Sequence, residues 1–319
     1  MAAMWALVRK GGAFSWETAY PRPKLKPGYV LLRVRGASLN PVDYKVPRLM
    51  LGPVVGIDVA GVVEEVGAGV TEWKPGDNVF GRALGTGSLA QFTVAKAGLL
   101  SRKPASLSWA EAAALPTAYL TGVQALRDHA KMAQGDRVLV IGASGGCGLA
   151  GLQLAKAFGV SEIVAVCSDA NAELCKGQGA DRIVDYKTQL ANRSLQDIFG
   201  PNYFDVVYDC ATNSGGGEDY KAQGLAVLKA RRTMVAINGR AMDWLRLFIA
   251  CPSKGYRLVT TGNAGNPADL DFFVRQNIKP IFHEGFAGVP LNQENVMNGF
   301  SLLKSRRTKG KIAFTVNED

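Results

Sequence analysis

The chain has 319 residues, of which 47% are hydrophobic and 20% charged, and its formal net charge is +10. This length and composition are typical of a soluble globular protein with two domains of ordinary size. They exclude a membrane-spanning helix, because no apolar run approaches the ~20 residues that a bilayer requires. The basic pair Arg9-Lys10 follows an apolar stretch, the reverse of a secretory signal, so we expect the chain to start folded with a strand at Met4–Val8.

The cysteines indicate the cellular compartment, and the distribution of basic residues indicates which partners to expect. The five cysteines are scattered without a CxxC pair, which indicates reduced thiols and predicts a cytoplasmic protein. The basic residues are dispersed apart from Arg231-Arg232 and Lys304–Lys311, so we interpret the charge as solvated surface with some attraction for a phosphorylated cofactor. An RNA-binding role is compatible with the charge, but no RNA-recognition motif supports it.

The first third of the chain has the pattern of short strands separated by turns. Lys26-Pro27-Gly28 is a turn before an apolar strand, and a second Pro-Gly turn leads into another. Density in Val and Gly after residue 54 is typical of twisted strands that bend. Together these segments predict a partly open barrel or a sandwich. The strands are expected within Val30–Arg35, Val54–Val66, Trp73–Phe80 and Leu89–Ala95.

From residue 108 onward the pattern changes to helices and strands in alternation. Ser108 followed by Glu111 is a capping box that predicts the start of an Ala-rich helix, which Pro116 interrupts. The later strands are almost continuously apolar, which predicts a parallel sheet covered on both faces. Expected strands are Arg137–Ile141, Glu162–Cys167, Ile183–Tyr186, Phe204–Asp209, Thr233–Asn238, Arg257–Thr261 and Lys311–Val316; expected helices are Ala118–His129, Leu149–Phe158, Ala172–Gln178, Ala268–Gln276 and Gln293–Ser305.

A glycine-rich turn joins the first of these parallel strands to the helix behind it. Glycine allows the sharp turn and the close approach of a pyrophosphate, and the helix N-terminus offers free N–H groups and a positive dipole end. A literal G-x-G-x-x-G begins at Gly146, inside the predicted helix, so we favour the register Ala143-x-Gly145-x-x-Gly148 at the strand end. The residues expected to hold a dinucleotide here are Ser144, Gly145, Gly146, Cys147 and Gly148.

The end of the next strand favours NADPH over NADH. An NAD site usually places an Asp or Glu there to bind the ribose diol, but this position is Cys167, which is neutral. Ser168 and Asn171 could donate hydrogen bonds to a 2′-phosphate, whereas Asp169 close by argues in the other direction.

Several motifs resemble the medium-chain dehydrogenase/reductase superfamily, and specifically its zinc-independent quinone oxidoreductase (zeta-crystallin-like) branch. They occur in the family's order over nearly the whole chain: Ser38–Asp43, Gly56–Val63, Lys74–Asp77, Ala112–Thr117 with Thr121-Gly122, the glycine turn, Gly179–Asp181 before Asp185-Tyr186, and Gly310–Ile312. The resemblance implies an α/β fold with a GroES-like β-barrel domain (1–117 and 264–319) and a Rossmann doubly wound parallel sheet (118–263), with NADPH and substrate in a cleft.

The resemblance also implies roles for individual residues. It places Asn40 and Thr121 at the nicotinamide end, Ser168 and Tyr186 near the adenosine phosphate, and Asn238-Gly239 beside the cofactor at a later strand end. Lys311 resembles a family lysine near the cleft. As catalytic candidates we name Asn40, Tyr44 and Lys45, the last two as groups that could polarise the acceptor carbonyl.

A metal is not expected. Zinc-dependent relatives carry Cys and His-Glu where this chain has Asn40–Asp43 and Gly56-Ile57-Asp58, and no cysteine precedes Cys147. Asp43 and Asp58 alone cannot make a tetrahedral site of nitrogen and sulfur ligands.

The predicted activity is metal-free hydride transfer from NADPH to a quinone. An enone or alkenal double-bond reductase with the same fold and cofactor is the first alternative, and an NADPH-linked RNA-binding protein is the second, although nucleic acid is an unlikely partner. Family members often form homodimers through edge strands of the Rossmann sheet, and the apolar run Trp244–Ala250 could cover such an edge.

Overall fold

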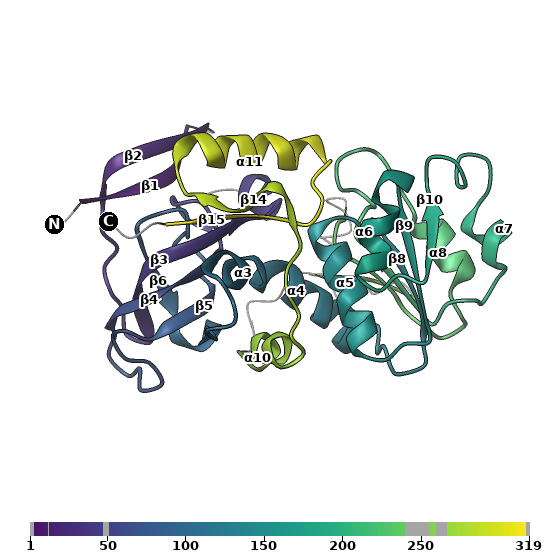
Figure 1. Ribbon diagram of the computed structural model, residues 1–319, viewed down its shortest axis with the longest axis horizontal. Coiled ribbons are helices and arrows are strands. Elements are labelled where there is room, and N and C mark those ends of the chain that lie inside the picture. The colour runs from purple at the N-terminus through teal and green to yellow at the C-terminus, as the bar shows by residue number, and fades with distance from the viewer. Residues whose placement is uncertain (1–2, 12, 47–50, 240–254, 260–266, 317–319) are drawn as a thin grey trace. The chain divides into compact units, whose positions relative to one another are not determined.

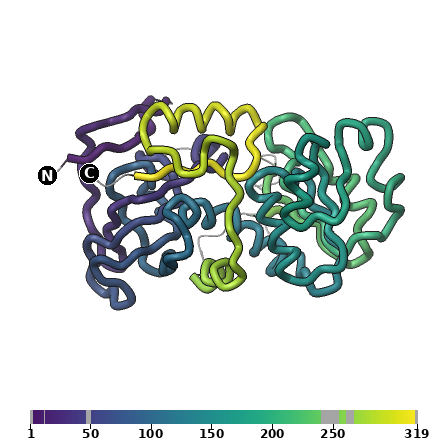
Figure 2. Tube along the Cα trace, viewed as in Figure 1, coloured from purple at the N-terminus to yellow at the C-terminus, as the bar shows by residue number. Residues whose placement is uncertain are grey.

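The computed structural model describes residues 3–11, 13–46, 51–239, 255–259 and 267–316. The chain divides into two compact units, which Figures 1 and 2 show in the same view. Unit 1 contains Met1–Leu120 and Gly262–Asp319, and unit 2 contains Thr121–Thr261. Each unit is described by itself below.

Unit 1 is built around a seven-stranded sheet. Along its main path the order is β14 (Phe282–Pro290), β15 (Lys311–Thr315), β3 (Tyr29–Leu39), β4 (Asp58–Val66), β5 (Asn78–Arg82) and β7 (Leu100–Arg102), and β6 (Phe92–Lys96) also pairs with β3. β1 (Ala3–Lys10) and β2 (Ala13–Pro21) form a separate antiparallel ribbon. In β15, Ile312 lies opposite Leu39 of β3, so a late segment of the chain completes a sheet begun by an early one, as the tube in Figure 2 shows.

Two of the helix starts in unit 1 follow from the local sequence, whereas we did not expect the short helix over Val42–Lys45. In α3 (Trp109–Ala114) the Ser108 side chain accepts from the Glu111 N–H and the Glu111 carboxylate accepts from the Ser108 N–H, which confirms the predicted capping box. A Cβ on Gly36 of β3 would lie 2.4 Å from the Trp109 carbonyl oxygen, so glycine is what lets α3 approach the sheet. α4 (Pro116–Val123) then starts at the predicted interruption, since proline is accepted in a first helical turn.

The core of unit 1 lies between the sheet and α11 (Gln293–Ser305). Phe300 of this helix is buried and stacks on Phe14 of β2 with ring centroids 4.7 Å apart. α1 (Val42–Lys45) follows β3 directly, and α10 (Pro267–Arg275) contributes the buried Phe273.

Unit 2 contains a six-stranded sheet in the order β10 (Arg182–Asp185), β9 (Glu162–Cys167), β8 (Arg137–Ile141), β11 (Val206–Asp209), β12 (Met234–Ala236) and β13 (Tyr256–Leu258). Every neighbouring pair is parallel, which confirms the prediction from the apolar strands. The helices between the strands are α5 (Gly146–Ala157), α6 (Ala172–Gly177), α7 (Leu195–Phe199) and α8 (Lys221–Val227).

Some boundaries differ from the sequence-based expectation. α5 begins at Gly146 and not at Leu149, because the turn brings Gly145 into the N-cap position despite the low helix propensity of the glycines that follow. The helix expected at Ala118–His129 ends as a π-helical turn over Gln124–His129. We did not expect β2, β14, α7 or α8, whose sequences mix polar and apolar residues without a clean period.

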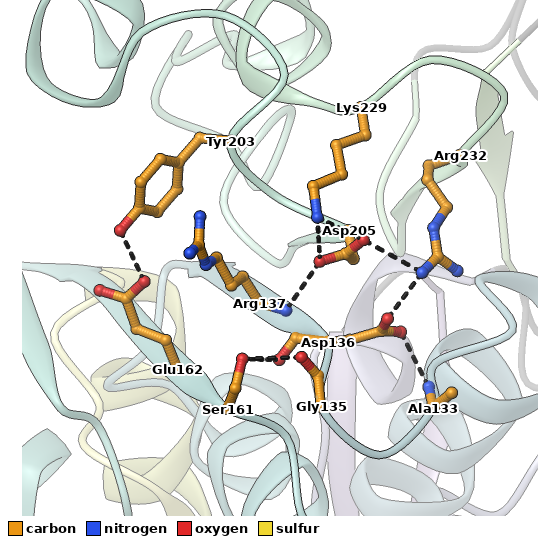
Figure 3. A network of polar contacts seen from close by, with 10 residues as sticks. All are labelled: Ala133, Gly135, Asp136, Arg137, Ser161, Glu162, Tyr203, Asp205, Lys229 and Arg232. Atoms are coloured by element: carbon orange, nitrogen blue, oxygen red, sulfur yellow. Dashed lines mark hydrogen bonds and ion pairs between the residues drawn. The ribbon is translucent and has the colours of Figure 1, made fainter.

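An ionic network crosses the amino edge of the parallel sheet (Figure 3). Asp205, which precedes β11, is 6% exposed and accepts from Lys229 Nζ at 2.8 Å and from Arg232 Nη2 at 3.1 Å. Arg232 also donates to Asp136 at 2.6 Å, beside the start of β8. Ligands of parallel sheets bind at the carboxyl edge, so we assign this network, at the opposite edge, to the stability of the fold.

Candidate functional site

The turn between β8 and α5 is closed by glycines. Gly142 has φ +73°, and a Cβ there would meet the Ala211 Cβ at 3.1 Å. A Cβ on Gly148 would lie 2.3 Å from the Gly142 carbonyl oxygen, a separation that no real side chain adopts. Gly145 is the N-cap, with no side-chain cap hydrogen bond. The N–H groups of the first turn of α5 therefore have no intrahelical acceptor and lie at the carboxyl end of β8, where an anion can bind.

Polar groups, both neutral and acidic, lie around this turn at the ends of β9 and β10: Asp185 is the last residue of β10, and Asp169 directly follows Ser168. Asn171 Nδ2 donates to Ser144 Oγ at 3.0 Å, which joins the turn to the segment that follows β9. Asn171 Oδ1 is buried and has no partner among the described residues. Ser168 is half-buried at the end of β9, and Tyr186, 43% exposed, follows β10. β8, β9 and β10 are neighbours, so these side chains share one edge of the sheet.

Cys167 takes the place where a ribose-binding carboxylate would stand. It is buried, 2% exposed. The interaction of its thiol with that of Cys175 in α6 lowers the pKa of Cys167, while the same interaction and burial raise the pKa of Cys175. The Cys167 side chain is therefore part of the buried packing of unit 2. Ser168 is the first residue after β9 ends.

The other predicted cofactor residues of unit 2 lie near the ends of β11 and β12 or in α4. Asn238 follows β12 and donates through Nδ2 to the Cys210 carbonyl at 3.2 Å, which ties it to the loop after β11; Gly239 is its neighbour. Asp209 ends β11, where its Oδ1 accepts from the N–H groups of Ala211 and Thr212, and burial raises its pKa. Thr121 is 5% exposed in α4.

Unit 1 holds a buried polar cluster, made of Ser38, Asn40, Asp43, Asp58, Thr117 and Lys311, at the ends of three strands. The Asp58 carboxylate is fully buried and is its centre. Its Oδ1 accepts from the N–H and hydroxyl of Thr117 at 3.0 and 2.5 Å. Its Oδ2 accepts from Ser38 Oγ at 3.1 Å and Asn40 Nδ2 at 2.9 Å. Lys311 Nζ donates to Asn40 Oδ1 at 2.5 Å and forms an ion pair with Asp58 at 3.6 Å.

Asp43 adds a second buried carboxyl group to this cluster. One oxygen accepts from the Asn40 N–H at 2.7 Å, and the other has no partner among the described residues. Burial raises the pKa of Asp43 to about 7; the Asn40 hydrogen bond, Lys311 and Arg9 oppose this shift and Asp58 adds to it. Arg9 donates to the Asp43 backbone carbonyl and so fixes α1 to β1.

Tyr44 and Lys45 occupy the outer side of α1. Tyr44 is half-buried with its ring edge-on to Phe300, and burial raises the pKa of its phenol. Lys45 is exposed, and partial burial together with Arg306 lowers the pKa of its ammonium.

The structure thus brings together some of the predicted site residues. Asn40 and Lys311 are in direct contact, Tyr44 and Lys45 share α1, and Ser144 lies on Asn171. Sequence reasoning missed the role of Asp58 as the centre of a cluster. The signal was present, because a lone carboxylate between Ile57 and Val59 interrupts an apolar run.

Two protein-family models match this chain, one in each unit. The family described as "Alcohol dehydrogenase GroES-like domain" matches residues 26–105, and "Zinc-binding dehydrogenase" matches residues 146–240. A 2-methylene-furan-3-one reductase of Solanum lycopersicum is 35% identical over 91% of this chain and 72% of its own length. The chloroplastic NADPH-dependent alkenal/one oxidoreductase of Arabidopsis thaliana is 32% identical over 97% of this chain and 78% of its own.

Solved structures are similar over the full length. The quinone oxidoreductase from Coxiella burnetii has a TM-score of 0.80 at 26% identity, covering 99% of this chain and 100% of that one. A mycobacterial protein solved with NADPH has a TM-score of 0.78 at 26% identity, covering 98% and 100%. These matches confirm the predicted family and fold class. The chain belongs to the quinone oxidoreductase family of the medium-chain dehydrogenase/reductase superfamily, and is an oxidoreductase with a GroES-like and a Rossmann-like part.

Proposed function

We propose that the chain is an NADPH-dependent, metal-free reductase that transfers hydride to a quinone. The observation that carries this proposal is the glycine-closed turn of unit 2 with its uncapped helix N-terminus, next to a strand that ends in the neutral Cys167 and is followed by Ser168. The turn fits a pyrophosphate, and the neutral strand end fits the 2′-phosphate of NADPH better than the free ribose diol of NADH.

When bound, the cofactor supplies the hydride, and the chain binds and orients the reactants. The first-turn N–H groups of α5, from Gly146 to Gly148, hold the pyrophosphate. Ser144, Ser168 and Tyr186 hold the adenosine phosphate, with Asn171 fixing Ser144 in place. Thr121 is proposed for the nicotinamide end, and Asn238 and Gly239 for a position beside the cofactor at a later strand end.

The residues of unit 1 do not fit a catalytic zinc ion. Asn40 and Asp58 stand where the zinc-dependent relatives have ligands, and both side chains are already bound to the Lys311 ammonium. The ammonium therefore lies against both side chains, and one amide with one carboxylate is not the set of cysteine, histidine and carboxylate ligands that a catalytic zinc ion takes. We infer that activation of the acceptor comes from hydrogen-bond donors of the chain.

Asn40, Tyr44 and Lys45 are the proposed donors to the acceptor. The raised pKa of Tyr44 keeps its phenol protonated, which a donor to a carbonyl oxygen requires. The enone or alkenal double bond is the alternative acceptor, favoured by the names of two relatives with long matches. The two acceptors share the same electronic demand, since hydride addition places negative charge on a carbonyl oxygen in both.

A steady-state assay tests the proposal. Oxidation of NADPH and of NADH is followed with a panel of 1,4-quinones and short 2-alkenals, with and without a strong zinc chelator. We expect quinone turnover, a lower KM for NADPH than for NADH, and no effect of the chelator. Equal use of NADH contradicts the cofactor assignment, loss of activity on chelation contradicts the metal-free assignment, and a higher kcat/KM for alkenals selects the alternative.

Two further predictions concern the location of the protein and its oligomeric state. None of the described helices has both the length and the apolar character that a bilayer span requires. A cytoplasmic location stays a prediction, and several plant relatives are named as chloroplast proteins. The homodimer also stays a prediction, because the run Trp244–Ala250 lies outside the described residues. We do not propose binding to RNA.

A further inference from the structure

Lys311 is a buried cation that contacts three groups of unit 1. Its side chain is 5% exposed, and its ammonium has three N–H donors. It donates to the Leu39 carbonyl at 3.2 Å and to Asn40 Oδ1 at 2.5 Å, and it forms an ion pair with Asp58 Oδ2 at 3.6 Å. The ammonium is therefore held by groups of unit 1, with Asn40 Oδ1 at the shortest distance.

This arrangement fixes which way the Asn40 amide faces. An ammonium only donates and a carboxylate only accepts, so Oδ1 must face Lys311 and Nδ2 must face Asp58. A flipped amide would put two donors together on one side and two acceptors on the other. The primary amide has two N–H donors, and the second has no acceptor among the described residues.

The same contacts polarise the amide. A cation on Oδ1 draws electron density from the amide nitrogen, and coupled hydrogen bonds of this kind strengthen one another. The remaining Asn40 N–H is therefore a stronger donor than that of an ordinary asparagine. Stability alone does not explain why Lys311 and Asp58 are buried here, because a buried ion pair is often no more stabilising than apolar residues of the same volume.

We propose that Lys311 is a positioning residue that acts through Asn40, turning the free Nδ2–H of that amide into the donor that stabilises the developing oxyanion of a quinone or enone. The role in the reaction rests on the proposed function, whereas the interaction of Lys311 with Asn40 does not. Asn40 is then the catalytic residue that touches the acceptor, while Lys311 and Asp58 hold and polarise it.

The electron balance of the step explains why one donor matters. Hydride addition to the β-carbon of an enone would break a C–H bond of the reduced dinucleotide, which is oxidised, and form the new C–H bond; the C=C electron pair moves toward the carbonyl carbon, and the carbonyl π pair becomes an oxyanion. A quinone gains charge on oxygen in the same way. One proton from water completes the product. A donor already aimed at that oxygen stabilises the charge without reorganising in the transition state.

Substitutions at Lys311 separate charge from hydrogen bonding. Lys311→Met removes both, Lys311→Gln keeps a neutral donor, and Lys311→Arg keeps the charge. We expect kcat to fall about 10- to 100-fold in Lys311→Met and less in Lys311→Gln, with partial rescue in Lys311→Arg. The loss should be larger for weakly electrophilic enones than for 1,4-benzoquinone, and NADPH affinity measured by fluorescence should stay within about twofold.

Matched controls perturb the same carboxylate without touching Asn40. Ser38→Ala and Thr117→Val each remove a hydrogen bond to Asp58. They should lower the melting temperature and leave kcat near the wild-type value. An equal fall in kcat in these controls would show that the cluster is only structural and overturn the proposal. In an Asn40→Ala background, Lys311→Met should cause no further loss of kcat; additive losses contradict action through Asn40.

A binding measurement tests the donor without turnover. 4-Nitrophenol is an oxyanion probe whose ionisation is visible in its absorption spectrum. The wild type should bind the phenolate in preference to the phenol, and Lys311→Gln and Asn40→Ala should each weaken that preference about tenfold. If the wild type reduces no quinone or enone, the proposed function fails and this titration still decides the role of Lys311. Absence of phenolate preference in the wild type, or the same preference in both variants, overturns the inference.

Discussion

Gly148 and Gly142 close the turn between β8 and α5 on each other, because a Cβ on Gly148 would lie 2.3 Å from the Gly142 carbonyl oxygen. Gly148→Ala must therefore shift the first turn of α5 away from β8. We expect a loss of about 1–3 kcal/mol in the free energy of unfolding and weaker NADPH binding by calorimetry.

Gly177→Ala is the matched control for that variant. Gly177 is also helical, but a Cβ there has nothing within 4 Å. Alanine should stabilise α6 by about 0.5–1 kcal/mol and leave NADPH affinity unchanged. Equal behaviour of the two variants would contradict a steric role for Gly148.

Ser168→Asp should reverse the cofactor preference. A carboxylate beside the 2′-phosphate repels it, so we expect kcat/KM for NADPH to fall about 100-fold while NADH is used as well as before or better. Glu173→Gln, on the exposed side of α6, is the control and should leave the ratio unchanged. A constant ratio in Ser168→Asp would remove this residue from the phosphate site.

Asp43 should make the stability of the protein depend on pH between about 4 and 7. Burial raises the pKa of Asp43 to about 7 in the folded chain, from 3.8, so the folded state binds the extra proton in this window. The stability that the protonated Asp43 side chain contributes is fully present below the pKa that Asp43 has in the unfolded chain, and it is lost as the pH rises to about 7. The slope is at most about 1.4 kcal/mol per pH unit.

Asp43→Asn is the variant that tests this assignment. The neighbouring charges Arg9, Asp58, Arg82 and Lys311 remain in place in the variant. Urea unfolding at a series of pH values should show that the slope between pH 4 and 7 becomes smaller. An unchanged slope would assign the pH dependence to another group.

Tyr44→Phe and Lys45→Met test the two outer residues of α1 separately. If the Tyr44 phenol donates to the acceptor, kcat should fall about 10-fold in Tyr44→Phe with KM for NADPH unchanged. Lys45 is exposed, and Lys45→Met should change kcat less than Tyr44→Phe. Unchanged turnover in both variants would leave Asn40 as the donor.

Asp205 should matter for stability and not for catalysis, because the residues of its network (Figure 3) precede β8, β11 and β12 and so lie at the amino edge of the sheet. Asp205→Asn weakens its contacts with Lys229 and Arg232, and we expect a loss of about 2–4 kcal/mol in chemical unfolding. KM for NADPH should not change. Lys10→Met, in an exposed pair with Glu17, should have no measurable effect on stability.

Local features of the fold could be predicted from the sequence, and long-range ones could not. The Ser108–Glu111 box depends on residues three positions apart, and the parallel strands of unit 2 are marked by their own apolar composition. The Asp58 cluster depends on the pairing of β15 with β3, which brings Lys311 to Asn40 across 271 positions. The sequence motifs contain both Asn40 and Lys311, but only the pairing of β15 with β3 brings the two side chains into contact.

The two strands of this pair are synthesised far apart in time. β3 leaves the ribosome early, whereas β15, its neighbour in the sheet, follows more than 270 residues later. During that interval the β3 edge that β15 will cover has no partner, while unit 2 is one continuous segment that can fold first. Nascent chains are therefore most exposed to wrong strand pairing while residues 121–261 are emerging, and chaperone binding should concentrate on this interval.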